Sequence, residues 1–132
     1  MRSSFRALTS VVGAVIAATV ALAACQKEIE PPFVRGVCFH AVPLKNGQFR
    51  FNKLSENQPN IEHCAASLEA MRQQFLGIGG SNQDLMGAYQ GSWIFVEKQG
   101  IFISQSLHGI KYLALVRTGN GYLAQPGAMP NE

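Results

Sequence analysis

The sequence predicts an α+β fold, with one strongly curved antiparallel sheet of about five or six strands and a single helix at residues 60–76 packed on one face. Short apolar runs are separated by tight turns, and such connections make neighbouring strands pair in the antiparallel sense. One long segment shows the three- and four-residue apolar spacing of an amphipathic helix. A sheet and a helix that bury their apolar sides together form a two-layer domain.

The first residues have the layout of a secretory signal. Arg2 and Arg6 precede a stretch from 7 to 24 that lacks charged residues and is rich in Ala and Val. Small residues then stand before Cys25, as at a signal-peptide cleavage site. The residues alone leave two other interpretations open, namely ordinary secretion and an uncleaved membrane span, although an Ala-rich run favours hydrocarbon only weakly.

The run Leu22-Ala23-Ala24-Cys25 resembles the lipobox of bacterial lipoproteins at all four positions. The resemblance is confined to residues 1–25. It implies that residues 1–24 are a cleaved signal peptide, that the Cys25 thiol receives a diacylglyceryl group, and that the new amino group is acylated, for example with palmitate. Gln26, in place of an Asp, implies a location in the outer membrane, facing the periplasm. Two or more acyl chains suffice for stable anchoring.

Residues 25–33 are predicted to form the tether between this anchor and the domain, because the segment combines charged residues with a Pro pair. The eight residues after Cys25 span at most about 25 Å. The chain has 11 basic and 8 acidic residues, and loss of Arg2 and Arg6 leaves 9 against 8. This balance predicts no nucleic-acid partner, since no basic stripe remains.

The predicted domain covers residues 34–124 and opens with a hairpin. Residues 34–42 form an apolar, β-branched run, and Lys45-Asn46-Gly47 is a typical hairpin turn. The return strand at 48–53 places Phe49 and Phe51 on one face.

The helix at 60–76 has clear boundary signals. Asn60 is a good N-cap, Glu62 lies in the positive first turn, and Gly77 is the expected C′ residue. Its apolar stripe consists of Ile61, Cys64, Leu68, Met71 and Phe75.

Residues 77–91 are predicted to form a loop with a brief helical turn that starts at Ser81. Strands are expected at 92–97, 101–104, 111–117 and 122–124, and residues 125–132 form a loose tail. Residues 93–96 and 112–116 are apolar on both faces, so the face away from the helix also needs a cover. We expect the curved sheet to pack on itself there, with a partner or dimer face as the alternative.

Cys38 and Cys64 remain once Cys25 is lipidated, and a pair of cysteines in an oxidising compartment predicts a disulfide. It would join the first strand to the helix. The alternative is a zinc site that adds His40 and His63 to the two cysteines, but the spacings do not match known zinc motifs.

The remaining residues predict no catalytic, metal or cofactor site. Ser104, Ser106 and His108 are close in sequence but lack the nucleophile elbow, and residues 77–81 lack the Lys of a phosphate loop. Trp93, Phe95 and Phe102 are candidates for an interaction surface, with core packing as the alternative.

The function that follows is a membrane-anchored envelope lipoprotein. We expect a non-enzymatic accessory or adaptor protein that presents a sheet surface to an envelope protein. A module that binds a small ligand or a cell-wall fragment is the alternative, and a hydrolase comes third.

Overall fold

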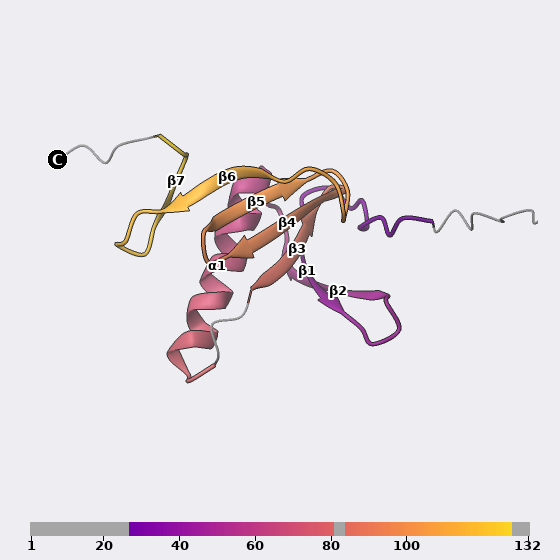
Figure 1. Ribbon diagram of the computed structural model, residues 1–132, viewed down its shortest axis with the longest axis horizontal. Coiled ribbons are helices and arrows are strands. Elements are labelled where there is room, and N and C mark those ends of the chain that lie inside the picture. Colours follow the sequence, from indigo (N-terminus) through magenta and orange to yellow (C-terminus); the bar gives the residue numbers. More distant parts are fainter. Residues whose placement is uncertain (1–26, 81–83, 128–132) are drawn as a thin grey trace, which may run out of the picture.

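The structure is a computed structural model that describes residues 27–80 and 84–127. Within these ranges the chain forms one open antiparallel sheet of seven strands and one helix (Figure 1). The α+β class is as predicted, but the sheet has seven strands instead of five or six. The elements are β1 (Cys38–Pro43), β2 (Phe49–Ser55), α1 (Ile61–Gly77), β3 (Leu85–Tyr89), β4 (Ser92–Glu97), β5 (Gly100–Ser104), β6 (Tyr112–Arg117) and β7 (Leu123–Ala124).

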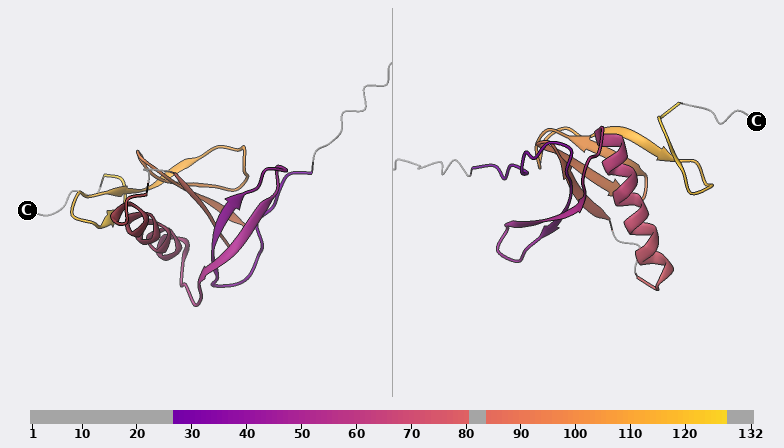
Figure 2. Two further views of the ribbon diagram at one scale, coloured as in Figure 1. Left: turned by 90° about the horizontal axis from the view of Figure 1, so that it is seen from below. Right: turned by 180° about the vertical axis from the view of Figure 1, so that it is seen from behind.

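The strand order is β2-β1-β3-β4-β5-β6-β7, so the chain is a simple meander except at the helix. α1 carries the chain from the edge strand β2 across β1 to β3, which pairs with β1 from Cys38↔Tyr89 to Ala41↔Met86. The helix lies across one face of the sheet (Figure 2). A segment near the middle of the sequence therefore supplies the cover of the central strands.

β3 lies within the segment 77–91 that the sequence predicts to be a loop, and this prediction is wrong for residues 85–89. Gly87 weakens the strand signal, because glycine is depleted in strand interiors. The packing explains its presence: a Cβ at this position would come within 2.3 Å of Leu68 Cδ1 and 2.9 Å of the Phe39 carbonyl oxygen. Gly87 therefore lets the helix approach the centre of the sheet.

The helix starts as predicted and ends one residue later. The Asn60 side chain accepts a hydrogen bond from the His63 N–H at 3.0 Å, which satisfies one of the free donors of the first turn. At the other end Gly77 is still helical, and Gly79 takes the left-handed conformation with φ of +88°. The prediction of Gly77 as the C′ residue is therefore wrong by two positions.

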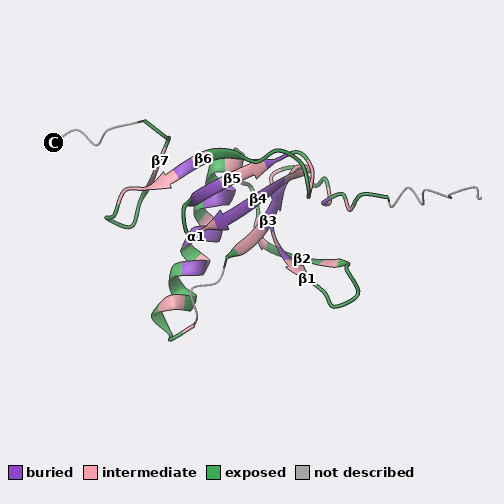
Figure 3. Cartoon of the chain, viewed as in Figure 1, coloured by how far each residue is buried: buried purple, intermediate pink, exposed green. Residues whose placement is uncertain are grey.

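The core on the helix side combines the apolar stripe of α1 with alternate residues of the central strands. Figure 3 shows the buried residues concentrated on these strands and on the inner face of the helix. Phe75, the last member of the predicted stripe, is 60% exposed, because the final turns of α1 project past the sheet. The buried residues of this cluster are Cys38, Cys64, Ala65, Leu68, Tyr89, Ile94, Val96, Ile101 and Leu115.

The opposite face is covered by the sheet itself, as expected for a strongly curved sheet. The ring centroids of Phe49 and Phe51 on β2 lie 5.1 and 5.8 Å from that of Trp93 on β4. In a flat sheet, β2 and β4 would be about 14 Å apart, since three inter-strand spacings separate them. The hairpin of β1 and β2 must therefore bend over this face, and both views of Figure 2 show it turned out of the plane of the other strands.

Candidate functional site

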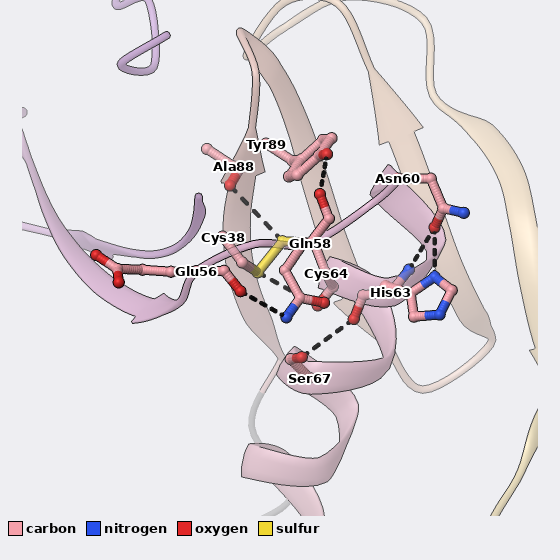
Figure 4. Close-up of a disulfide and its surroundings, with 9 residues drawn as sticks. All are labelled: Cys38, Glu56, Gln58, Asn60, His63, Cys64, Ser67, Ala88 and Tyr89. Carbon is pink, nitrogen blue, oxygen red and sulfur yellow. Dashed lines mark hydrogen bonds between the residues drawn. A yellow bond between two sulfur atoms is a disulfide. The ribbon is translucent and has the colours of Figure 1, made fainter. Parts of the chain in front are cut away.

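The disulfide predicted between Cys38 and Cys64 is present and joins β1 to the first turn of α1 (Figure 4). The two Cα atoms are 5.2 Å apart, and both residues are fully buried. Their sulfur atoms are consequently not thiolate ligands, and the zinc alternative loses half of its donor set. The bond fixes the start of the helix on the sheet.

Hydrogen bonds hold the loop that leads into the helix. The Tyr89 hydroxyl donates to the Gln58 carbonyl at 2.7 Å, and the Gln58 N–H donates to the Gly36 carbonyl at 2.8 Å. The Gly36 N–H in turn donates to the Gln90 side chain at 2.9 Å. The His63 ring contacts the Asn60 side chain at 2.7 Å, so this predicted zinc ligand has a capping partner instead. These contacts, drawn in part in Figure 4, make the disulfide region a rigid structural unit.

A buried ionic network fixes the other half of the helix. Arg117 on β6 donates from Nε and Nη2 to the two carboxylate oxygens of Glu69 at 2.7 and 2.8 Å. Its Nη1 donates to the carbonyl oxygens of Glu97 and Lys98 at the β4–β5 turn. Arg72 Nη1 lies 3.4 Å from Glu69 Oε1. Three elements are thus tied together through one carboxylate.

Burial alone would raise the pKa of Glu69, but the hydrogen bonds and charge of Arg117, with help from Gln73 and Arg72, lower it overall. The same carboxylate raises the pKa of Arg117. This network is absent from the sequence predictions. Its signal was the spacing, since Glu69 and Arg72 stand four residues after Ala65 and Leu68 and so share the buried face of the helix.

The predicted interaction surface of Trp93, Phe95 and Phe102 is not a surface in this structure. Trp93 and Phe95 are buried, and Phe102 is half-buried beside them, in the cluster covered by β2. The prediction of a surface is wrong because the curvature of the sheet turns its apolar outer face inward. These rings act as the core of the second layer.

Part of the predicted tether at 25–33 packs against this second core. Ile29 contacts the cluster of Trp93 and Phe95, and Pro31 is buried. A cavity of about 770 Å³ lies where this segment meets the β1–β2 turn and the β5–β6 loop. The overlooked signal is Ile29 itself, a single large aliphatic residue among charged neighbours.

The three residues considered for catalysis do not form a catalytic arrangement in the described part of the chain. Ser104 is buried, and its hydroxyl donates to the Ser106 carbonyl at 2.6 Å. Neither Ser106 nor His108 has a hydrogen bond to a carboxylate within residues 27–80 and 84–127. These serines act in closing the loop after β5.

A second cavity, of about 400 Å³, lies between the C-terminal half of α1 and the ends of β1 and β3. Its polar groups come from one histidine, one arginine and one aspartate. Burial, followed by the charge of Arg50, lowers the pKa of His40, which favours the neutral ring. Its lining includes His40, Met71, Arg72, Phe75, Asp84 and Leu85.

The two edges of the sheet differ in chemistry. β7 pairs with β6 only at Val116 and Arg117, so within the described residues the outer edge of β6 has no strand partner from 112 to 115. Tyr112 and Leu113 on this stretch are exposed. The other edge, β2, carries Arg50, Asn52 and Lys53 on its exposed positions. Charged side chains on an edge strand discourage pairing with another chain, and residues 112–115 of β6 carry none.

The expected lipid anchor at Cys25, the signal peptide before it and Gln26 lie outside the described residues. Among those that are described, no helix is long and apolar enough to cross a membrane, and no group of three or more potential metal ligands occurs.

Comparison with protein-family models, with curated proteins and with solved structures gave no match.

We expect the removal of the disulfide to destabilise the domain by about 3.5 kcal/mol, because the loop of 26 residues would then regain its freedom in the unfolded chain. Urea unfolding of the Cys38→Ala/Cys64→Ala variant measures this loss. Alkylation of the non-reduced protein should leave both cysteines unmodified, and modification of both would contradict the bond.

We expect Glu69→Gln to lower the free energy of unfolding by about 3 kcal/mol, since the guanidinium groups of Arg117 and Arg72 then lose the negative charge of the buried carboxylate. Because the pKa of Glu69 is lowered on folding, its contribution is present above its ordinary value near 4.5 and is lost as the pH falls through the folded-state pKa. The difference in stability between parent and variant should therefore shrink in acid. Glu56→Gln, in the exposed pair with Lys53, is the control and should change little.

Proposed function

We propose that this chain is an exported bacterial lipoprotein, anchored through acyl chains on Cys25, whose domain is a non-enzymatic adaptor for another envelope protein. The observation that carries the first part is the buried disulfide between Cys38 and Cys64. Such bonds persist in oxidising compartments and are rare in the cytosol. Together with the run Leu22-Ala23-Ala24-Cys25, it supports export followed by lipidation.

The open edge of β6 supports the adaptor role. An extended peptide can add to an exposed strand edge through main-chain hydrogen bonds, while its side chains find sites on the two faces. Residues 112–115 offer such an edge, and Tyr112 and Leu113 add exposed apolar area on opposite faces of the sheet. The partner is therefore an extended, mainly apolar segment of an envelope protein. Gln26 favours an outer-membrane location for the complex.

The cavity at His40 supports a second candidate, a small-ligand module. Its volume of about 400 Å³ lies in the range of ligand sites, and apolar walls combine there with charged groups. The adaptor ranks first because the edge of β6 is open without any rearrangement. A cell-wall fragment that raises the unfolding temperature of the parent, but not of His40→Ala, would reverse this order. His108→Ala is the matched control.

We expect Cys25→Ser to abolish lipidation and to release the protein from membranes into the soluble envelope fraction. Each buried methylene contributes about 0.8 kcal/mol to anchoring, so the loss of the acyl chains removes the main attachment. Fractionation and the mass of the mature N-terminal peptide measure both effects. Unchanged partition of the Ser variant would refute the anchor.

We expect a photo-crosslinker at Leu113 to capture one defined protein in cells, and Tyr112→Lys to suppress the adduct several-fold because the added charge guards the edge. A crosslinker at Asn52, on the charged edge of β2, is the matched control. Equal adducts from both positions would argue against a role for the β6 edge.

A further inference from the structure

The segment before β1, the β3–β4 turn and the β5–β6 loop gather at one end of the sheet, which we call the anchor end (residues 27–36, 90–91 and 105–111). Figures 1 and 2 show these segments together, opposite the β6–β7 hairpin. Phe33, Gly91 and Gln105 line one shallow cavity with Glu28 and Ile29, which confirms that the three segments meet. We propose that the anchor end rests on the surface of the bilayer that holds the lipid anchor. This inference depends on the proposed lipidation of Cys25.

The stretch of free chain between the domain and Cys25 is short. Ile29 packs against the core cluster of Trp93 and Phe95, so the chain is fixed to the domain from this residue onward. Only four residue steps separate Ile29 from Cys25, which is at most about 14 Å of extended chain. A lipid on Cys25 therefore keeps the anchor end close to the headgroups. The free part of the predicted tether is thus shorter than its nine residues, 25–33, would allow.

The anchor end exposes several large apolar side chains. Phe33 and Ile110 are each 73% exposed, and Val34 is 48% exposed. Exposure of large apolar side chains to water is unfavourable, whereas their insertion at the boundary between headgroups and acyl chains is favourable. Since these three residues lie at the end of the domain from which the chain leads back toward Cys25 (Figure 1), the bilayer is the apolar phase nearest to them in the proposed anchored protein. The proximity of the anchor therefore favours the bilayer as the partner of these apolar side chains.

The charges of the anchor end nearly cancel, so they add little attraction to a membrane. The exposed cations Lys27 and Arg35 are balanced at this end by Glu28 and Glu30. Lys111 is engaged by Glu97 at 2.8 Å. The contact is therefore apolar and depends on the anchor for its local concentration. It should respond weakly to salt and to the fraction of anionic lipid, in contrast to a polybasic membrane patch.

In this orientation the β6–β7 hairpin points away from the membrane. The open edge of β6 begins near the bilayer, at Tyr112, and runs outward, so a partner strand would approach from the side. The membrane contact and the proposed partner contact then use different residues.

Depth-dependent fluorescence quenching tests the proposal on the full-length lipidated protein in vesicles of phosphatidylcholine and phosphatidylglycerol. An environment-sensitive label is attached at Ile110→Cys, and the matched controls are Tyr122→Cys in the β6–β7 hairpin and Ile78→Cys after α1, which are comparably exposed. Lipids with a nitroxide near the headgroup should quench the label at 110 several-fold more than the controls. A side chain inserted about 5–10 Å into the boundary between headgroups and acyl chains lies close to such a nitroxide. High salt should leave this difference unchanged.

The variant Phe33→Ser/Val34→Ser should reduce quenching at position 110, whereas Tyr122→Ser should not. Equal quenching at 110 and 122 in protein whose Cys25 is lipidated would overturn the docking and leave the proposed function intact. Absence of lipid on Cys25, seen by mass spectrometry, would overturn both. Quenching that disappears in high salt would replace the apolar contact by an electrostatic one and so contradict the proposal.

Discussion

The bond between Cys38 and Cys64 is the constraint on which this fold depends. The helix follows an edge strand, crosses the sheet and returns the chain to a central strand, so its position is not defined by local pairing. The disulfide fixes the first turn of α1 above β1, Gly87 then admits Leu68 against the sheet, and the Glu69–Arg117 ion pair ties the next turn to β6. A covalent bond, a steric opening and an ion pair thus act in sequence along one helix.

The second layer of the domain is built from the sheet's own edge hairpin. Most small antiparallel sheets leave one face to solvent, but this sheet is apolar on both. With its one described helix committed to the first face, the molecule covers the second with its own edge hairpin and with the segment around Ile29. The aromatic rings of Phe49, Phe51 and Trp93 meet as a result. The curvature of the sheet is therefore part of core formation.

The fold could be predicted from the sequence wherever a feature is local. Asn60 and the apolar spacing gave the helix to within a residue, and the two cysteines gave the disulfide. β3 was missed because Gly87 serves packing between layers, which no local pattern reports. The sequence allows Trp93 and Phe95 to lie on a surface or in the core, and only the curvature of the sheet decides between the two. Glu69 and Arg117 are 48 residues apart, and their pairing depends on the complete sheet.

The unequal edges of the sheet also determine how the protein can assemble. A strand added at β6 would extend the sheet by one, while the lysine and arginine of β2 discourage a second addition on the far side. A domain with one open and one charged edge would accept the proposed partner strand at β6 and would not pass the pairing on to a further chain at β2. Such an arrangement disfavours the open-ended growth that leads to fibres.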